Sequence, residues 1–407
     1  MLEVHDAKER ILERFAALPP IEVSLGDAQG LISAADIAAP HALPPFDNSA
    51  MDGYAVQRPD VENATESNSS ELKLIGEVRA GDDVILEVVS GAAARIMTGA
   101  PLPPGADAVV PIEQADDDGA TVTVRAAPPP RGHVRHSGED VNPGDVVVPA
   151  GTRLGAGELA LLASLGVAHV EVHPRPVIAV VTTGDELVDV EDELRPGQIR
   201  DSNLVALRAL VEETGAEPVP YARVADDRDS VIEALQRAAK EADLVVAAGG
   251  VSVGRYDFVK EAVEELGAID FWRVAMQPGK PVVSGHIAGT PFLGLPGNPV
   301  SVHVGFEQFV RPAILKLSGE RSLDRPVITA TLSDAIEKPP GRLHFVRVRL
   351  HLIDGRVVAT PTGPQGSHIQ SSLVACDGLA RFPIEATKID AGDPVEVEVW
   401  SLPKPLS

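Results

Sequence analysis

Between residues 174 and 319 the chain alternates short apolar runs with helical segments, and this alternation constrains its fold more than any other feature. The run from Val177 to Val181 is apolar at every position, as in a strand covered on both faces. Strands joined by helical crossovers form a doubly wound α/β sheet, in which we expect parallel strands and a ligand site beyond their carboxyl ends. The predicted strands cover 177–181, 217–224, 243–248, 269–274, 281–284 and 291–295, and the predicted helices cover 202–214, 229–241, 256–266 and 299–317.

The segments on either side of this unit favour β structure. Between residues 21 and 172, short β-type runs alternate with Gly and Pro, and Asp116-Asp-Asp-Gly119 is typical of a hairpin turn. Helices are predicted only at 6–18 and 156–165, and strands return after residue 326. We therefore expect a multidomain α/β and β protein, with β-rich N-terminal domains and a small C-terminal β domain. The expected domains comprise residues 1–43 with 143–173, then 44–142, 174–319 and 320–407.

The charge and the cysteine content exclude several classes of protein. The 407 residues carry a formal net charge of −25, which argues against binding to nucleic acid or to anionic membranes. Cys376 is the only cysteine, so no internal disulfide or CxxC zinc site can form. The N-terminus lacks a signal pattern, and no uncharged apolar run approaches the roughly 20 residues that span a bilayer. We therefore expect a cytoplasmic protein.

Three loops rich in Gly, Pro and small polar residues follow predicted strands. They are Thr182-Thr-Gly-Asp-Glu186, Gly249-Gly-Val-Ser-Val-Gly254 and Gly294-Leu-Pro-Gly-Asn-Pro299. Glycine lets the backbone approach a ligand closely, and a helix N-terminus behind such a loop offers free N–H groups to an anion. Each loop alone is also typical of ordinary turns and helix caps. Because all three meet at one sheet edge, they predict a pocket for a phosphate or an oxyanion.

The glycine-rich loop also permits a different interpretation. Gly250-Val-Ser252-Val-Gly254 matches the nucleophile elbow of serine hydrolases, which need an acid and a histidine on later loops. However, His303 lies in a predicted helix, and His286 precedes only one further strand. The sequence therefore disfavours a hydrolase.

Acidic residues gather in two turn-like segments of the first half. Phe46-Asp-Asn-Ser-Ala-Met-Asp-Gly-Tyr54 leads toward a strand, and Gly138-Glu-Asp140 lies in a second polar loop. Mg²⁺ binds through one or two carboxylates together with substrate phosphates. The spacing therefore permits a magnesium site, although capping aspartates in turns explain it equally well.

Several motifs together make the chain resemble the molybdopterin molybdenumtransferases. The most specific are Asp47-Asn-Ser-Ala-Met-Asp-Gly-Tyr54 and Leu295-Pro-Gly-Asn-Pro299. The resemblance covers nearly the whole chain. The remaining motifs are Met97-Thr-Gly-Ala-Pro101, Gly138-Glu-Asp140, Thr183-Gly-Asp-Glu186, Gly249-Gly-Val-Ser-Val-Gly254, Pro278-Gly-Lys-Pro281 and Gln365-Gly-Ser-His368.

The resemblance implies a fold, a reaction and an assembly. Members of the family have four domains, of which the third shares the molybdopterin adenylyltransferase fold. They form homodimers with the active cleft between the third domain of one subunit and the second domain of the other. They use Mg²⁺ to insert molybdate, or tungstate, into adenylylated molybdopterin with release of AMP. Contacts with the adenylyltransferase and with recipient molybdoenzymes are further expectations.

The resemblance also implies roles for individual residues. Asp52 is the expected essential group, holding Mg²⁺ or orienting the nucleophile, and Asp140 supports it as a second metal ligand. Thr98 and Glu186 complete the catalytic cleft. The expected pterin-phosphate and AMP contacts are Gly249, Gly250, Ser252, Asp257, Lys280, Pro296, Gly297 and Asn298. Ser367, His368 and Arg342 are expected to contribute to the oxyanion site.

Two departures from the family pattern reduce the local positive charge. Many relatives have more arginine where this chain has Arg135-His-Ser137, and many have lysine in place of Gln277. The oxyanion contacts and the choice between molybdate and tungstate therefore stay open. Two alternatives remain: an adenylyltransferase-type step, which needs only the doubly wound domain, and a non-catalytic scaffold, which does not need the intact acidic motif.

Overall fold

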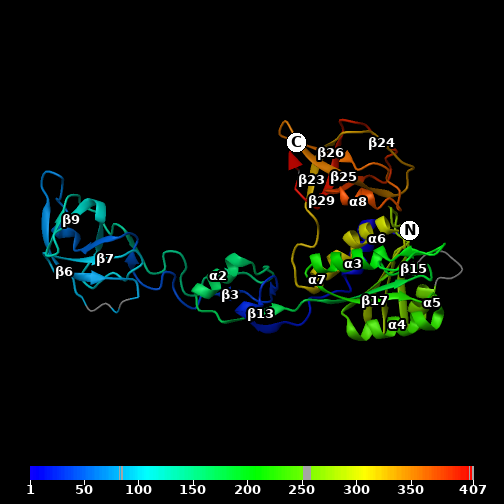
Figure 1. Ribbon diagram of the computed structural model, residues 1–407, viewed down its shortest axis with the longest axis horizontal. Helices are drawn as coiled ribbons and strands as arrows, with labels where there is room; N and C mark the ends of the chain where they lie inside the picture. The colour runs from blue at the N-terminus through cyan, green and yellow to red at the C-terminus, as the bar shows by residue number, and fades with distance from the viewer. Residues whose placement is uncertain (82, 84–85, 251–257, 403, 406–407) are drawn as a thin grey trace.

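The computed structural model describes residues 1–407 except 82, 84–85, 251–257, 403 and 406–407. The chain is elongated, with a β-rich lobe at one end, a narrow connection, and an α/β lobe beside a second β lobe at the other end (Figure 1). We name these the distal lobe (44–142), the connecting lobe (16–43 and 143–173), the α/β lobe (1–15 and 174–319) and the C-terminal lobe (320–407). We propose these residue ranges as the limits of the four lobes.

The α/β lobe contains a six-stranded sheet, mostly as predicted. Its strand order is β17-β14-β18-β22-β21-β19. The first four strands are parallel, but β21 runs in the opposite direction and pairs antiparallel with both β22 and β19, so the prediction of parallel strands is wrong for β21. Only Ala288 and Gly289 separate β21 from β22, and a parallel crossover needs far more residues. The strands are β14 (Val177–Thr183), β17 (Glu217–Val224), β18 (Leu244–Ala248), β19 (Gly267–Trp272), β21 (Val283–Ile287) and β22 (Thr290–Leu295).

Helices cover both faces of this sheet, as in a doubly wound fold. One face packs against α4 (Arg228–Glu241) and α5 (Phe258–Leu266). The other packs against α3 (Ser202–Glu213) and the predicted long helix. That helix consists of α6 (Pro299–Gly305), a π-helical segment (Phe306–Val310) and α7 (Arg311–Leu317). Apolar residues on both sides of each strand therefore reach a covered face.

The first helix differs from the sequence-based division into domains. Helix α1 (Val4–Leu12) is shorter than predicted, and its apolar side is buried in the same cluster as Ile178 and Val180 of β14. Residues 1–15 therefore pack with the α/β lobe, whereas the sequence placed them with 16–43. The apolar side chains of this segment predict that one face of the helix is buried, but they do not predict which part of the protein covers it.

The connecting lobe is small and formed by two distant parts of the chain. Its three-stranded sheet has the order β1-β13-β2, and β3 pairs with β12 beside it. The predicted helix is confirmed as α2 (Ala156–Ser164), and Gly166 with φ +71° ends it. The strands are β1 (Ile21–Ser24), β2 (Ile32–Ser33), β3 (Ile37–Ala38), β12 (Val146–Val148) and β13 (His169–His173).

The distal lobe is built on a six-stranded sheet of order β8-β5-β7-β6-β10-β9. The predicted hairpin is confirmed, because β9 pairs antiparallel with β10 across the turn at Gly119. A two-stranded sheet, β4 with β11, lies beside it. The strands are β4 (Asn48–Ser49), β5 (Gly53–Val56), β6 (Ser70–Val78), β7 (Ala92–Ile96), β8 (Ala108–Pro111), β9 (Ala115–Asp117), β10 (Thr121–Val124) and β11 (Val134–Arg135).

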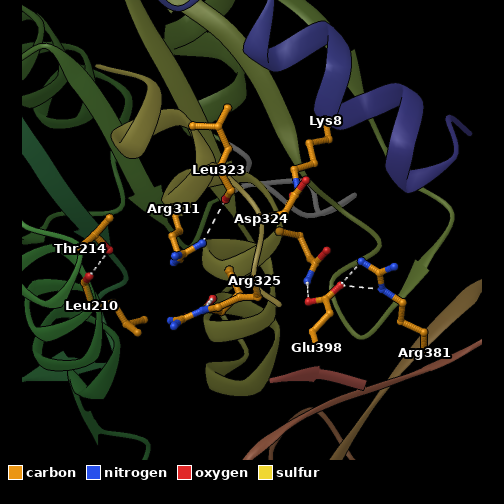
Figure 2. Close-up of polar contacts among 11 residues, drawn as sticks. Lys8, Leu210, Thr214, Arg311, Leu323, Asp324, Arg325, Arg381 and Glu398 are labelled. Carbon is orange, nitrogen blue, oxygen red and sulfur yellow. Dashed lines mark hydrogen bonds and ion pairs between the residues drawn. The ribbon is translucent and has the colours of Figure 1, made fainter. Parts of the chain in front are cut away.

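One short strand of the α/β lobe joins the sheet of the C-terminal lobe. Strand β20 (Met276–Gln277) pairs with β25, which places Gln277 opposite His344. The buried Glu398 accepts a hydrogen bond from Arg381 of its own lobe at 2.8 Å (Figure 2). It also accepts one from Gln308 of the α/β lobe at 2.7 Å, which strengthens this junction. The other main elements are β23 (Val327–Leu332), β24 (Ile336–Glu337), β25 (Leu343–Ile353), β26 (Arg356–Pro361), α8 (Ser371–Val374), β27 (Gly378–Phe382) and β29 (Pro394–Val399).

The described part of the chain contains no helix that is both long and apolar enough to cross a membrane.

Candidate functional site

A polar cavity of about 640 Å³ opens between the α/β lobe and the C-terminal lobe. The sequence predicted many of its lining residues as binding or catalytic groups. These are Glu186, Lys280, Pro296, Gly297, Asn298, Arg342 and Ser367. Three segments of the α/β lobe and two of the C-terminal lobe supply them, so the cavity exists only where the two lobes meet.

The Leu295-Pro-Gly-Asn-Pro299 loop forms one wall of this cavity and is tied to the C-terminal lobe. It joins β22 to α6, with Pro299 at the start of the helix. The Nδ2 of Asn298 donates to Ser367 Oγ at 3.1 Å, and the N–H of Val300 donates to the Ser367 carbonyl at 3.2 Å. Ser367 therefore uses part of the free hydrogen-bonding capacity of this helix N-terminus and fixes the distance between the two lobes.

The N-terminus of α3 supports the same loop. The Asp201 carboxylate caps the helix by accepting from the N–H of Leu204 at 3.0 Å. Asn203, in the first turn, donates through Nδ2 to the carbonyl of Gly297 at 2.8 Å. Ser202 accepts from Gln370 of the C-terminal lobe at 3.0 Å. Sequence reasoning missed these residues, although Asp201-Ser-Asn203 at a predicted helix start was a signal for a cap.

The glycine pair at the end of β18 lies beside this wall. Gly249 and Gly250 have φ of +97° and +62°, which favour glycine. A Cβ at Gly249 would lie 2.8 Å from the carbonyl oxygen of Thr183, and one at Gly250 would lie 2.6 Å from the Val259 side chain. Close packing of the loop therefore explains the two glycines whether or not a ligand is bound.

Two cations lie on the cavity wall, one from each lobe. Lys280 follows β20 and Arg342 precedes β25. Neither forms an ion pair with a described carboxylate, and Glu186 is the one carboxylate among the described lining residues, so cations outnumber anions on the wall. In a chain of net charge −25, this local excess of positive charge suits an anionic ligand.

The predicted acidic groups lie in the distal lobe. Asp52, just before β5, accepts through Oδ1 from both the N–H and the hydroxyl of Thr98, at 2.7 and 2.8 Å. The hydrogen bond from the Thr98 N–H, followed by that from its hydroxyl, lowers the pKa of Asp52. The carboxylate is exposed and stays ionised at neutral pH. The structure therefore joins two of the four predicted catalytic residues.

Asp140 lies on a hollow next to this pair. The hollow, of about 440 Å³, is lined by Asp140, Arg135, Asn48, Phe46 and Gly99, the residue that follows Thr98. Hydrogen bonds hold the segment, because Asp47 accepts from the N–H of Ser137 at 2.8 Å and contacts His136 Nδ1 at 3.2 Å. The Ser137 N–H is the largest cause that lowers the pKa of Asp47, and His136 acts in the same direction.

The two groups of predicted site residues lie in lobes at opposite ends of the elongated molecule. The distal lobe carries Asp52, Thr98 and Asp140, and the connecting lobe separates it from the α/β lobe with Lys280 and Glu186 (Figure 1). A single chain therefore does not bring them together. Among the described residues, no group of three or more His, Cys, Asp or Glu side chains forms a metal cluster.

Among the predicted binding residues that the structure describes, Gly249, Gly250 and His368 are not lining residues of the cavity. Ser252 and Asp257 lie outside the described residues. His368 follows the lining residue Ser367 but is exposed and is not among the described lining residues, so its place in the oxyanion site stays a prediction.

The two histidines of the hydrolase alternative have other surroundings. His303 is in α6 and packs on Trp400, with ring centroids 4.9 Å apart. His286 is in β21, within the sheet. These positions disfavour a catalytic triad with Ser252.

Comparisons with known proteins agree with this arrangement of lobes. Family models match residues 2–166 as the MoeA N-terminal region (domain I and II), 179–316 as a probable molybdopterin binding domain, and 329–400 as the MoeA C-terminal region (domain IV). Molybdopterin molybdenumtransferase 2 of Mycobacterium tuberculosis is 40% identical over 99% of this chain and 100% of its own length. The molybdopterin molybdenumtransferase of Haemophilus influenzae is 38% identical over 98% and 99%.

Solved structures show the same architecture. Two crystal structures of the molybdopterin biosynthesis protein MoeA of Pyrococcus horikoshii have TM-scores of 0.85 and 0.83. They are 33% and 30% identical to this chain and cover 98% of it, while it covers 99% and 100% of them. The fold thus defines a multidomain protein whose α/β domain matches a probable molybdopterin binding domain. The chain belongs to the molybdopterin molybdenumtransferase family, the enzymes of molybdenum cofactor biosynthesis.

Proposed function

We propose that this enzyme inserts molybdate, or tungstate, into adenylylated molybdopterin with the help of Mg²⁺ and releases AMP. The observation that carries this proposal is the cavity with Lys280 and Arg342 between two lobes of a strongly acidic protein. A nucleotide pyrophosphate and a doubly charged oxyanion repel each other, by about 4 kcal/mol per pair of unit charges at 4 Å and an effective dielectric constant near 20. Two cations on the wall reduce this repulsion.

The complete site requires two subunits. Within one subunit, Asp52 and Lys280 belong to lobes at opposite ends of the elongated molecule (Figure 1). We place the distal lobe of one subunit against the cavity of the partner in a homodimer, which brings the acidic groups to the bound pyrophosphate. The exposed Phe46 and Met51 beside Asp52 are apolar groups that this contact would cover.

Each half of the cleft has its own task. Lys280, Arg342, Ser367 and Asn298 bind the oxyanion and the phosphate groups, while the neighbouring glycine loops admit the pterin and the nucleotide. In the cleavage step a water oxygen attacks the AMP phosphorus and loses a proton to solvent, the P–O bond to the molybdopterin phosphate breaks, and that phosphate leaves. Asp52, whose pKa is lowered, is a weak base, and it therefore orients the water and would hold a cation. Glu186 faces the same cavity from the other subunit.

Magnesium fits the acidic half of the site. Asp52 has a second carboxylate oxygen, Oδ2, that accepts no hydrogen bond from the described residues, and Asp140 is exposed. One or two carboxylates together with substrate phosphates are the usual ligands of Mg²⁺. The ion would supply charge neutralisation at the phosphate oxygens, and Asp52 and Asp140 would hold it.

The reaction is tested directly with purified enzyme. Adenylylated molybdopterin, Mg²⁺ and either molybdate or tungstate are supplied, and AMP release is followed for each oxyanion. Oxyanion-dependent AMP release supports the proposal and shows which metal is preferred. An enzyme that instead consumes ATP to form adenylylated molybdopterin would prove to be an adenylyltransferase, and no turnover in either assay would favour a scaffold.

The shared cleft is tested by subunit complementation. Asp52→Asn and Lys280→Ala are each expected to abolish AMP release without unfolding the chain. A mixed dimer of the two variants regains one intact cleft, because wild-type Asp52 and Lys280 then come from different subunits. Activity from isolated mixed dimers, carrying one tag per subunit type, supports the shared cleft. Inactive mixed dimers would place the whole site within one chain.

Two proposals follow for the cellular setting. The single, half-buried cysteine fits the reducing cytoplasm, where we expect the reaction. We also propose contacts with the adenylyltransferase and with recipient molybdoenzymes, through which the substrate and the product would pass directly between proteins without diffusing through solution.

A further inference from the structure

Two buried cations lie behind the C-terminal wall of the cavity. Arg347, in β25, is fully buried, and Lys338, just after β24, is 7% exposed. Neither forms an ion pair with a described carboxylate. Such cations are rare in protein interiors, because burial removes their hydration and nothing of opposite charge replaces it.

Each cation holds the backbone of a residue that lines the cavity. The Nζ of Lys338 donates to the carbonyl of Arg342 at 3.0 Å, to that of Ile384 at 3.1 Å and weakly to that of Pro339 at 3.5 Å. The Nη2 of Arg347 donates to the carbonyl of Gly366 at 3.2 Å. Arg342 and Gly366 both face the cavity. The two contacts therefore connect the buried charges to two separate segments of one wall.

The remaining contacts of Arg347 reinforce the second segment. Its side-chain Nε donates to the buried Ser372 hydroxyl of α8 at 3.1 Å, and its backbone N–H donates to Gln365 Oε1 at 2.9 Å. Its Nη1 has no hydrogen-bond partner among the described residues. The guanidinium holds the Gln365–Ser367 loop through neutral partners, with one nitrogen unsatisfied by the described residues. Burial lowers the pKa of Arg347, but an arginine side chain stays charged at neutral pH.

His344 is a titratable neighbour of both buried cations. His344 lies on β25 and is 5% exposed. Burial, and then the positive charges of Arg347 and Lys338, lower its pKa to about 4. Burial lowers the pKa of Lys338, and the exposed Glu385 is the one described carboxylate whose charge acts in the other direction. The wall behind the cavity thus carries two positive charges, with the imidazole neutral between pH 5 and 8.

We propose that Lys338 and Arg347 are positioning residues that hold the C-terminal wall of the cavity in place and keep it positively charged for a doubly charged oxyanion. This inference rests on the proposed function, because it assigns a task to the wall of the same cavity. Arg342 and Ser367 contact the anion, while the buried pair acts through their backbone and through its field. The carbonyl oxygens of Arg342 and Gly366 are thereby turned into the lobe and away from the anion.

The experiment measures the affinity of the full-length enzyme for two tetrahedral anions of similar size, molybdate with two negative charges and perrhenate with one. Calorimetry is performed on wild type, Lys338→Met, Arg347→Met and Arg347→Lys, each checked for folding by circular dichroism and thermal unfolding. Arg349→Met is the matched control, because Arg349 lies on the same strand and is exposed, and its loss is the same change in charge.

The expected result is a loss of molybdate affinity of about tenfold or more in both Met variants, and a clearly smaller loss of perrhenate affinity, because the field acts on the charge of the ligand. Arg347→Lys is expected to retain most of the molybdate affinity, and Arg349→Met all of it. If Arg347→Met does not fold, Lys338→Met carries the test alone.

Equal losses for both anions would overturn the proposal and assign the pair a purely structural role. No loss beyond that of Arg349→Met would overturn it as well. A wild-type enzyme that binds neither molybdate nor tungstate would instead contradict the proposed function.

Discussion

The carboxylate of Asp52 accepts two hydrogen bonds from Thr98 through the same oxygen, Oδ1, one from the N–H at 2.7 Å and one from the hydroxyl at 2.8 Å. These contacts join residues that are far apart in sequence and leave Oδ2 without a partner among the described residues. They orient a carboxylate that is otherwise exposed. The oxygen without a partner is therefore the one presented to the neighbouring subunit in the proposed dimer.

Replacement of the hydroxyl tests the role of this orientation. In Thr98→Val the N–H donor remains but the hydroxyl is lost, so the pKa of Asp52 should rise toward its usual value. We expect AMP release to fall by about tenfold, in line with the loss of a charge-assisted hydrogen bond, and its acidic limb to move to higher pH. Thr98→Ser keeps the donor and should behave like wild type. An unchanged pH profile in Thr98→Val would show that the hydroxyl does not set the ionisation of Asp52.

Gln277 provides a test of the charge in the cavity. It lies on the wall with Lys280 and Arg342 and is neutral. Gln277→Lys should raise molybdate affinity by about three- to tenfold at low salt, because a third cation faces the dianion, and the gain should shrink as ionic strength rises. Gln277→Met controls for the loss of the amide. A gain that is independent of salt would contradict an electrostatic origin.

His344 should make the C-terminal lobe sensitive to acid. Its folded-state pKa is about 4, below the usual 6.5, so between these values the unfolded chain binds a proton that the folded chain does not. Stability therefore rises with pH across this window, and acidification from pH 7 to pH 4 should remove at most about 3 kcal/mol. Urea unfolding of wild type and His344→Gln at both pH values measures the effect. An equal loss in the variant would assign the acid sensitivity to other groups.

Gly319 tests the junction between the connecting lobe and the α/β lobe. Its φ is +79°, and a Cβ would lie 2.1 Å from the ring of His173. Gly319→Ala should destabilise the chain by about 1–3 kcal/mol, from backbone strain and steric overlap together. Gly355→Ala is the control, because Gly355 has a similar φ of +76° with open space around it. Equal unfolding midpoints for the two variants would show that His173 yields without cost.

The local pattern of the sequence predicted most individual elements. Apolar periodicity and Gly or Pro punctuation gave α2 with its terminating Gly166, the hairpin of β9 and β10, and the α/β alternation from β14 to α7. It failed for the direction of β21, because a strand has the same apolar pattern in either direction. It grouped α1 with residues 16–43 and did not predict that the helix packs against the α/β lobe. Both points concern packing partners, which short-range patterns do not specify.

For the candidate site as well, the sequence predicted some features and not others. The sequence pointed to Lys280, Asn298, Arg342 and Ser367, which line one cavity, but also to His368, which is exposed. It gave no signal for Lys338, because a lysine near a turn is usually a solvated cation. Only its surroundings, three carbonyl groups and the Phe382 ring, distinguish it from a surface residue.

The sequence by itself determined the order of strands and helices, the glycine loops at the ends of strands and the acidic turn around Asp52, because each depends on residues within a few positions of one another. The tertiary structure decided which of these motifs share a cavity. Asn298 meets Ser367 and Gln277 lies opposite His344 only because the C-terminal lobe docks on α6 and takes β20 into its sheet. Docking depends on shape, burial and charge over whole surfaces, so it follows from the folded arrangement of the chain and not from any one stretch of it.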